Sequence, residues 1–206
     1  MPIGLTLLNI QFVGNNMSRK FENLEVVAIQ EVKKRIRNGV SKALLPINHT
    51  LRLHLINNCI VTGGCSYSLS LNREPNDWDL LFKDEMSAHA FTAYIADHKE
   101  DVMDMGQYLG ADTKAGKLIT ANAVTLKNKV QVIDWKWQRN NFDFIHCMPW
   151  YDLQADKYHI ASEQYDAIKN KQLIARDPDT YVPDNNRLKK WLDRGFTIEF
   201  KVDELV

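Results

Sequence analysis

The sequence predicts an α/β (α+β) fold in which helices flank a mixed β-sheet. The first observation behind this prediction is a short apolar run at 59–62 that ends in Gly63 and Gly64. The second is a later apolar run that opens with Asp77 and Asp79, separated by a single hydrophobic residue. Segments with helical spacing of apolar residues precede, separate and follow these runs. Short buried strands that alternate with helices are typical of α/β domains.

Two helices are expected before the glycines. Residues 21–37 contain no glycine or proline, and their apolar residues recur at roughly helical spacing. Basic residues near the end of this segment complement the helix dipole, and we expect Gly39 to end the helix. A second helix should follow Pro46 and bury one face. The apolar residues of that face are Leu51, Leu55 and Ile56.

The region around the aspartates should alternate between helix and strand. We expect one or two helical turns at 65–71, a strand at 78–83 and a helix at 84–98. The residues of this last helix that should face inward are Met86, Ala90, Phe91, Tyr94 and Ile95.

Three further runs, at 117–126, 130–135 and 142–147, have the composition of strands. Asn128 and Lys129 suit a tight turn between the first two runs.

The two ends of the chain are expected to add peripheral elements. Residues 1–13 are apolar without a basic start, which indicates an N-terminal strand or packing arm rather than a secretory signal. Helices are expected near 162–171 and 184–194. The second should be capped by Asp184 or Asn185 and stopped by Gly195.

Size and composition indicate an ordinary globular protein. The chain has 206 residues, 45% of them hydrophobic, and equal numbers of basic and acidic residues, 26 each. We expect a single domain over 1–206, with a catalytic core at about 45–150 and a C-terminal helical part at about 151–206. A net charge of zero argues against binding nucleic acid through a global basic field.

Cysteine usage and hydropathy suggest the compartment. The chain has three cysteines without Cys-x-x-Cys spacing, which indicates a reducing cytosol rather than a disulfide framework. No apolar run approaches the roughly 18 residues of a membrane span. We therefore expect a cytoplasmic protein with no membrane partner, whose oligomeric state stays open.

The two aspartates carry the clearest chemical signal. In a strand, residues i and i+2 point to the same face, so Asp77 and Asp79 would direct two carboxylates to one point. A hard cation such as Mg²⁺ suits this arrangement, because it binds one or two carboxylates together with substrate phosphates. Gly63 and Gly64 lack a Cβ and would allow the backbone to approach a phosphate closely. Converging carboxylates should also raise at least one pKa through mutual repulsion.

This pattern resembles the signature of polymerase-β-type nucleotidyltransferases: an apolar strand, Gly-Gly, a short helix, then Asp-apolar-Asp-apolar. The spacing is especially similar to that of CCA-adding enzymes and bacterial poly(A) polymerases. With the later run Phe-Asp-Phe-Ile-His-Cys, the order also resembles nucleotidyltransferase-like proteins of tailed phages. The resemblance implies a minimal nucleotidyltransferase fold with N- and C-terminal helical additions. The alternative is a tight turn and a solvated hairpin with two exposed aspartates.

The resemblance also implies a third carboxylate on a later strand. Asp143 fits this role, because it alternates with Phe142 and Phe144 inside an apolar run. Asp134 is the rival, although it lies near the end of its run. Asp143 could instead be a strand aspartate paired with a lysine or arginine. If the role is correct, Asp77, Asp79 and Asp143 would bridge two metal ions.

Several polar residues are weaker candidates for binding the nucleotide. Ser66 or Ser68 could help the glycine-loop amides hold a triphosphate, or could cap the helix. Arg73 could reach a phosphate or be a solvated loop residue. The run 187–196, with Arg187 and Lys190, resembles the basic helix that crosses the nucleotide in several of these enzymes, and also fits an amphipathic surface helix.

A further set of residues is expected to lie mainly in the core. His146 and Cys147 have no second pair at metal spacing, so core packing is favoured over zinc binding. Four aromatic residues could stack bases, although most should be buried. They are Trp135, Trp137, Trp150 and Tyr151.

The resemblance has limits that affect the substrate. CCA-adding enzymes carry an Arg-Asp pair just after the glycines, where this chain has Ser66 and Tyr67, and their Arg-Arg-Asp motif has no clear counterpart. CCA addition to tRNA is therefore not carried over.

The expected function is a nucleotidyltransferase (EC 2.7.7 type) that uses an NTP with Mg²⁺ or Mn²⁺ and releases pyrophosphate. The acceptor hydroxyl could belong to RNA, a protein or a small molecule, in the cytoplasm of an infected bacterium if the protein comes from a phage. The alternative is a catalytically inactive nucleotidyltransferase fold that binds nucleotides or a protein partner.

Overall fold

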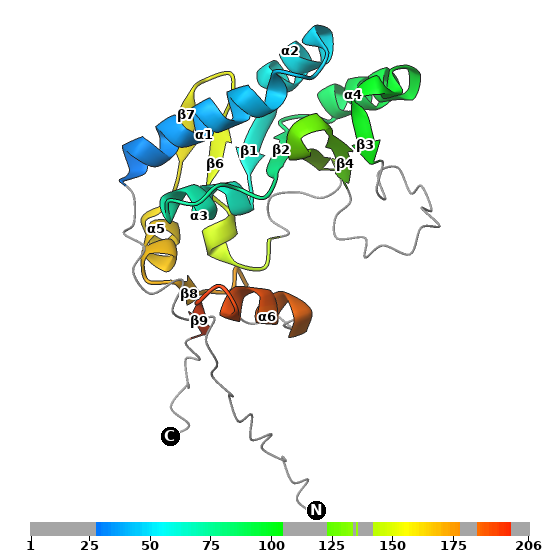
Figure 1. Ribbon diagram of the computed structural model, residues 1–206. Coiled ribbons are helices and arrows are strands. Elements are labelled where there is room, and N and C mark those ends of the chain that lie inside the picture. The colour runs from blue at the N-terminus through cyan, green and yellow to red at the C-terminus, as the bar shows by residue number, and fades with distance from the viewer. Residues whose placement is uncertain (1–27, 105–122, 134, 136–141, 178–184, 199–206) are drawn as a thin grey trace, which may run out of the picture.

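The computed structural model describes residues 28–104, 123–133, 135, 142–177 and 185–198, and its centre is a seven-stranded mixed sheet in the order β3-β4-β5-β2-β1-β6-β7 (Figure 1). The strands are β1 (Cys59–Thr62), β2 (Trp78–Phe82), β3 (Val102–Asp104), β4 (Ala123–Leu126), β5 (Val130–Ile133), β6 (Trp150–Asp152) and β7 (Lys157–His159). In this sheet, as the described residues form it, β2 and β5 pair in parallel and the other neighbouring strands pair antiparallel. The predicted mixed α/β class is confirmed.

Six helices accompany this sheet in the described residues. They are α1 (Ile29–Leu44), α2 (His49–Asn58), α3 (Gly64–Ser70), α4 (Glu85–Asp97), α5 (Ser162–Lys169) and α6 (Asn185–Leu192). Helix α6 lies at the lower end of the molecule in Figure 1, below α3 and the sheet. Beside it, a parallel pair of short strands joins β8 (Gln172–Leu173) to β9 (Thr197–Ile198). This pair ties the C-terminal end of the chain to the segment after α5.

The predicted end of the first helix at Gly39 is wrong. Helix α1 continues through Gly39 to Leu44, and the glycine has a packing role instead. A Cβ added at Gly39 would lie 2.4 Å from the indole of Trp78 in β2. The indole therefore occupies the space that a side chain at position 39 would fill. The glycine therefore sets how closely α1 approaches the sheet.

The elements around the aspartates agree closely with expectation. Strands β1 and β2 lie where they were predicted and pair antiparallel, with Thr62 opposite Asp79. Helix α4 begins after Asp84, whose side chain accepts a hydrogen bond from the Ser87 amide at 2.8 Å. Two of its residues expected to face inward, Met86 and Ala90, are exposed instead. The buried face of α4 is formed by Ala88, Phe91 and Ile95.

The predicted strand at 142–147 is not a strand. Phe144 forms an isolated bridge with Ala175, and Ile145–Cys147 then form one turn of 3₁₀ helix, η6. By contrast, Asn128 and Lys129 form the predicted turn between β4 and β5, with φ of 54° and 60°. Two consecutive left-handed residues are what a tight hairpin turn requires.

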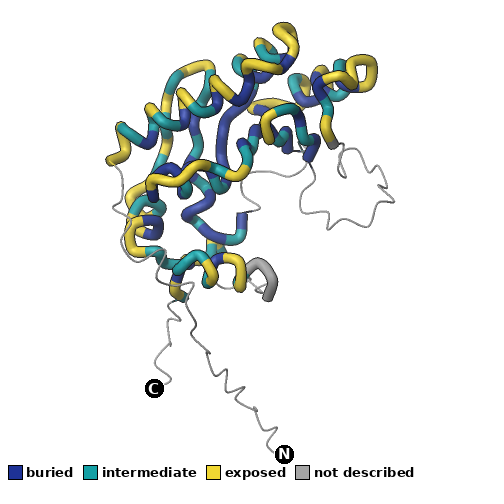
Figure 2. The backbone as a smooth tube through the Cα atoms, viewed as in Figure 1, coloured by how far each residue is buried: buried dark blue, intermediate teal, exposed yellow. Residues whose placement is uncertain are grey.

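Three hydrophobic clusters stabilise the described elements, and the buried stretches of the backbone run through the strands and the inner sides of the helices (Figure 2). The smallest cluster consists of Ile60, Leu81, Ala123 and Ile133. The sheet core joins α1, α2 and α4 to the strands. Its members with no exposed surface include Ile36, Leu55, Val61, Leu80, Phe91, Val124, Leu126, Val130 and Val132. The aromatic cluster joins α3 to the C-terminal segments. It consists of Tyr67, Leu71, Phe142, Phe144, Cys147, Ile168, Leu173, Trp191 and Phe196, in contact with His146.

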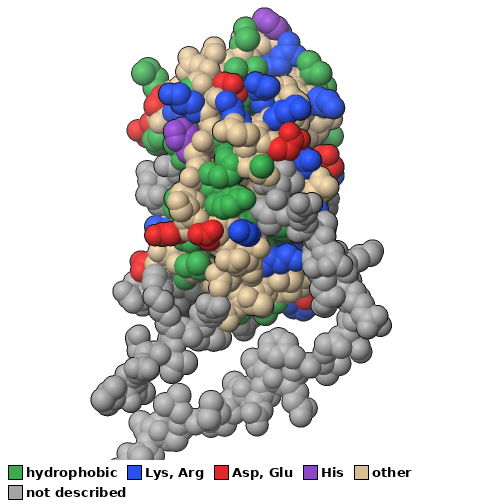
Figure 3. All heavy atoms as spheres, turned by 90° about the vertical axis from the view of Figure 1, so that its left-hand side faces the viewer, with side chains coloured by type: hydrophobic (Ala, Val, Ile, Leu, Met, Phe, Trp, Pro, Cys, Tyr) green, Lys and Arg blue, Asp and Glu red, His purple; other side chains and the backbone are tan. Residues whose placement is uncertain are grey.

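The surface mixes both signs of charge. On the face turned to the viewer in Figure 3, lysines and arginines gather in the upper half with acidic side chains among them. In the described ranges, no helix is long and apolar enough to cross a bilayer. The predicted N-terminal strand at 1–13 and the residues 117–122 of the predicted strand at 117–126 lie outside the described residues.

Candidate functional site

The Gly-Gly turn and the Asp-x-Asp run meet at the end of β1. Gly63 has a φ of 77°, which favours glycine, and a Cβ at this position would lie 2.2 Å from the Asp79 carboxylate oxygen Oδ2. A Cβ added at Gly64 would meet no atom within 4 Å. The two glycines thus have different roles: Gly63 permits the backbone to contact Asp79, while Gly64 leaves open space at the start of α3.

Asp77 lies half-buried in the loop that leads into β2. Burial raises its pKa above the ordinary value, and the opposing influence of three cations, Lys190, Arg194 and Lys129, limits the rise. Both aspartates also raise the pKa of the buried Cys65 thiol, after the larger effect of burial, so the two carboxylates face the same part of α3. A raised carboxyl pKa was expected, but its main cause is burial rather than repulsion between carboxylates.

The C-terminal helix supplies two of these cations. The Arg194 guanidinium lies 5.7 Å from the Tyr67 ring centroid and 4.8 Å from that of Trp191. Lys190 Nζ lies 5.7 Å from the Trp191 ring. The two aromatic rings attract the guanidinium through cation–π interactions. Lys190 and Arg187 were both predicted as binding residues. The side chain of Arg187 lies outside the described residues.

Sequence reasoning did not select Lys129 or Arg194 as binding residues. The position of Lys129 follows from the β2–β5 register. This register places Val130 opposite Trp78, and hence Lys129 beside Asp77. Such a parallel pairing between distant strands leaves no local signal. Arg194 lies in the turn that follows α6, directly before Gly195 with its φ of 83°, and a basic residue just after a helix is ordinarily assigned to the helix dipole.

The two weaker candidates near α3 occupy contrasting environments. Ser66 is completely buried, and its hydroxyl has no hydrogen-bond partner among the described residues. Ser66 does not cap α3 either. The N-cap residue is Gly63, and the cap contains no side-chain hydrogen bond. Arg73 lies exposed and acts on the Tyr67 hydroxyl, lowering a phenol pKa that burial raises. Arg73 is therefore near the aromatic cluster and accessible from solvent.

The third carboxylate does not join the other two. Among the residues that the structure describes, no three His, Cys, Asp or Glu side chains form a group that could hold a metal ion. Asp143 is instead part of a segment fixed to 174–176, where its carbonyl accepts a hydrogen bond from the Arg176 amide at 2.9 Å. The rival, Asp134, lies outside the described residues.

His146 lies in the aromatic cluster, as core packing predicted. It is fully buried, with ring centroids 4.3 Å from Trp191 and 4.5 Å from Phe196. Neither ring nitrogen has a hydrogen-bond partner within the described ranges. Burial, with a smaller effect of Arg194, lowers the pKa of His146 to about 3. The imidazole is thus neutral at physiological pH.

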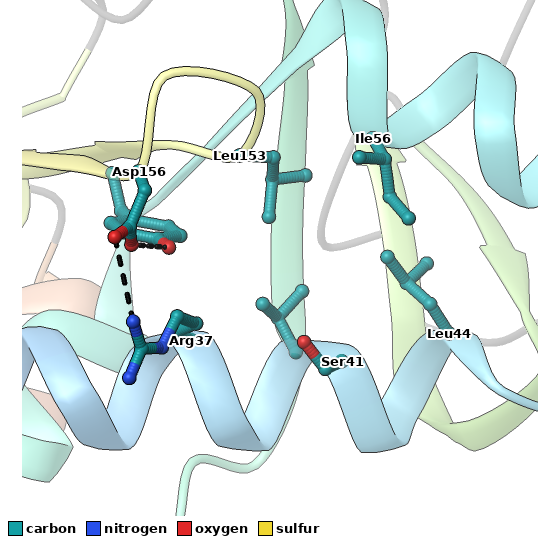
Figure 4. Close-up of a pocket in the computed structure, with 8 residues that line it drawn as sticks. Arg37, Ser41, Leu44, Ile56, Leu153 and Asp156 are labelled. Carbon is teal, nitrogen blue, oxygen red and sulfur yellow. Dashed lines mark hydrogen bonds and ion pairs between the residues drawn. The ribbon is translucent and has the colours of Figure 1, made fainter.

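A separate hollow lies between α1 and the β6–β7 hairpin (Figure 4). At its polar end Asp156 contacts Arg37 at 3.4 Å and accepts a hydrogen bond from the Tyr151 hydroxyl. The pocket is lined by Arg37, Val40, Ser41, Leu44, Ile56, Tyr151, Leu153 and Asp156. Of the candidate residues, Tyr151 lines it, whereas none of the predicted glycines, carboxylates or phosphate-binding residues does, so the hollow is distinct from the Gly-Gly turn.

Residues 31–171 match the model of the Gabija anti-defense 2 family proteins, which is more than half of the chain. The chain belongs to the Gabija anti-defense 2 family. A relative from Bacillus phage SPbetaL7, "Gabija anti-defense 2", is 25% identical over 150 residues. That alignment covers 69% of this chain but 34% of the relative, so the chain spans about a third of the relative's length.

Solved structures of similar fold come from tRNA-processing proteins. A tRNA-processing enzyme in an apo form matches with a TM-score of 0.50 and 13% identity, over 84% of this chain and 45% of that one. The Thermotoga maritima CCA-adding enzyme complexed with tRNA matches with a TM-score of 0.49 and 17% identity, over 79% and 42%. At such low identity the likeness concerns the fold alone, and the mixed α/β fold of this chain is similar to that of the tRNA-processing enzyme.

Proposed function

We propose that this family member is a phage nucleotidyltransferase that counters Gabija defence by transferring a nucleotidyl group from an NTP to a hydroxyl acceptor. The observation that carries the proposal is the contact between Gly63 and Asp79, beside the half-buried Asp77. Two carboxylates next to an open, Cβ-free turn suit a metal ion that carries substrate phosphates. The space beside Gly64 is open at the start of α3, whose first amides have no partner within the helix.

Asp77 and Asp79 fit a single Mg²⁺ or Mn²⁺ that shares its remaining positions with substrate phosphates and water. When bound, such an ion would neutralise charge on the phosphates during transfer. The three-carboxylate arrangement expected for two metal ions is not formed by the described residues. Asp143 therefore enters the proposal as the candidate group near the acceptor, and Asp77 and Asp79 as the metal ligands.

The protein's own residues would act mainly by positioning the substrate. The acceptor hydroxyl loses its proton to water and its oxygen bonds to the α-phosphorus. The bond between that phosphorus and the oxygen bridging to the β-phosphate breaks, and pyrophosphate leaves. Lys190 and Arg73 would attract the phosphates. Ser66 would contribute its backbone amide, because its hydroxyl is buried. Holding the reacting groups in one geometry is a large part of catalysis in transfers of this kind.

Incubation with NTPs labelled at the α-phosphate, Mg²⁺ and host lysate or RNA tests this function. We expect label in an acceptor with the wild type and a loss of about a hundredfold or more with Asp79→Asn, because the metal ligand is lost. Asp97→Asn, an equal charge change at the exposed end of α4, is the control. Incorporation that Asp79→Asn leaves undiminished would overturn the enzymatic role.

The inactive-fold alternative has one observation in its favour, since Asp143 does not join Asp77 and Asp79. Plating a phage on a host that carries Gabija, with each variant expressed, separates the two functions. Protection of the phage that is lost with Asp79→Asn supports nucleotidyl transfer. Protection that survives Asp79→Asn supports a binding role in the bacterial cytoplasm.

A further inference from the structure

The hollow between α1 and the β6–β7 hairpin is a groove with apolar walls (Figure 4). Its volume is about 200 Å³. Val40 and Leu44, from successive turns of α1, form one wall and belong to the sheet core. Ile56 of α2 and Leu153 of the hairpin are partly buried and lie across the groove from Leu44. The groove therefore has room for an apolar side chain between α1 and the hairpin.

Apolar surface continues beyond the groove where α1 meets α2. Leu53 lies one turn before Ile56 on α2 and is 45% exposed. Leu45, directly after Leu44, is 65% exposed, and its carbonyl accepts a hydrogen bond from the Arg52 guanidinium at 2.8 Å. An occupant longer than one side chain would therefore meet further apolar surface at this end.

The polar end of the groove requires no charge from an occupant. Asp156 Oδ1 accepts a hydrogen bond from the Tyr151 hydroxyl at 2.5 Å. Its second oxygen, Oδ2, pairs with Lys33 at 3.2 Å and with Arg37 at 3.4 Å. A charged occupant would have to compete with these pairs, whereas an uncharged occupant leaves them intact. The groove thus favours an uncharged, apolar occupant.

The segment 1–13, which precedes α1 and lies outside the described residues, has this composition. It contains no charged residue, although a quarter of the whole chain is charged. Residues 14–28 can span roughly 50 Å when extended, whereas Val40 lies about 17 Å along the helix axis from the start of α1. The chain is therefore long enough to turn back along α1. The large apolar residues of the segment are Ile3, Leu5, Leu7, Leu8, Ile10, Phe12 and Val13.

We propose that the apolar segment 1–13 docks in this groove and places a leucine, isoleucine or phenylalanine side chain between α1 and the hairpin. The tether through residues 14–28 gives the segment an effective concentration on the order of millimolar at the groove. A contact that is too weak for a free peptide therefore suffices. The same segment of a second copy has only the much lower concentration of the protein in solution. The docking does not rest on the proposed function, because the groove is distinct from the Gly-Gly turn.

Paramagnetic labelling of the full chain tests the docking. Gly4→Cys introduces a cysteine for a nitroxide label, while the native cysteines are buried. We expect the label to broaden the NMR methyl signals of Leu44, Ile56 and Leu153 within the same molecule. A mixture of spin-labelled chains and isotope-labelled chains without the nitroxide reports contacts between copies. Broadening of equal strength in that mixture would identify a second copy as the occupant and overturn the proposal. Absence of broadening at the groove would overturn it as well.

Two matched pairs of full-length variants then assign the contact. Ser41→Glu adds a charge at the groove, and Asn38→Glu adds the same charge at an exposed position of α1 outside its lining. The double change Leu7→Asp and Leu8→Asp places charges inside the segment, and Asn15→Asp with Asn16→Asp adds two charges just after it.

In each pair the first variant should abolish the broadening and the second should retain it. The double change lies outside the described fold, so its result does not depend on whether α1 tolerates Ser41→Glu. Broadening that survives both Ser41→Glu and the double change would show that the segment does not use this groove, and the proposal would be overturned.

Discussion

The sheet core and the aromatic cluster stabilise this protein in different ways. The sheet core is mostly aliphatic and is organised by strand register, from α1 through β1 and β2 to β5. The aromatic cluster contains a buried histidine and a guanidinium stacked on two rings. The carboxylates of the candidate site come from the end of β1–β2, whereas Arg194 and Lys190 depend on the cluster. The candidate site therefore depends on both regions, and substitutions in the sheet core should have different effects from substitutions in the aromatic cluster.

The largest effect is expected from Gly63→Ala. The added Cβ would lie 2.2 Å from Asp79 Oδ2 at a backbone φ of 77°, so the carboxylate must move. Nucleotidyl transfer should fall by roughly a hundredfold or more, because misplacing a catalytic group by an ångström can have that effect. Steady-state transfer assays provide the measurement.

Gly64→Ala is the matched control for that substitution. It introduces the same methyl group one residue later, where no atom lies within 4 Å and the residue is helical. Nucleotidyl transfer should fall less than with Gly63→Ala, because the methyl group narrows the space for phosphates without displacing Asp79, and stability should rise slightly from reduced flexibility of the unfolded chain. Equal losses in the two variants would show that Asp79 is not what Gly63 protects.

Trp191→Ala should separate the two regions in stability. The indole is almost fully buried among Tyr67, His146 and Phe196, and its removal should cost about 3–5 kcal/mol. Hydrogen exchange should accelerate in α6 and η6 and stay slow in β1 and β2. A Leu80→Ala variant, in the sheet core, should instead loosen the strands. Uniform acceleration by Trp191→Ala would show that the clusters unfold as one unit.

His146→Phe tests the polar member of the aromatic cluster. Burial lowers the folded-state pKa of His146 to about 3, below the unfolded value. The stability that the neutral imidazole contributes is therefore lost as pH falls from about 6.5 toward 3. The wild type should lose about 1–2 kcal/mol more than the variant between pH 7 and pH 5. Urea unfolding at both pH values measures this. His89→Gln, on the exposed side of α4, should follow the wild type.

The smallest effect is expected from Asp77→Asn. Because burial raises the folded-state pKa of Asp77, the ionised carboxylate destabilises the fold, and this penalty grows as pH rises through the unfolded and then the folded value. The variant should melt slightly higher at pH 7, and its stabilisation by Mg²⁺ should be smaller. Identical Mg²⁺ shifts in both proteins would show that Asp77 is not a metal ligand.

Local sequence predicted four strands of the sheet, β1, β2, β4 and β5, but not β3, β6 or β7. Residues 59–62 and 78–82 formed strands because apolar runs beside Gly63 and Asp79 leave few alternatives, and a two-residue period fixes which side chains share a face. Asn128 and Lys129 formed their turn for a similarly local reason. These features depend on neighbours in the chain, so the chain itself carries the signal.

The tertiary structure decided the remainder. Gly39 does not end a helix but lies inside α1, where the Trp78 indole occupies the space beside it. The segment around Asp143 pairs with Ala175 rather than with the sheet, and Phe142 and Phe144 pack in the aromatic cluster. Lys129 lies beside Asp77 through a parallel strand pairing, and Arg194 is placed by a cation–π contact with Trp191. Such contacts join residues far apart in the sequence, and their energy depends on packing that no local pattern records.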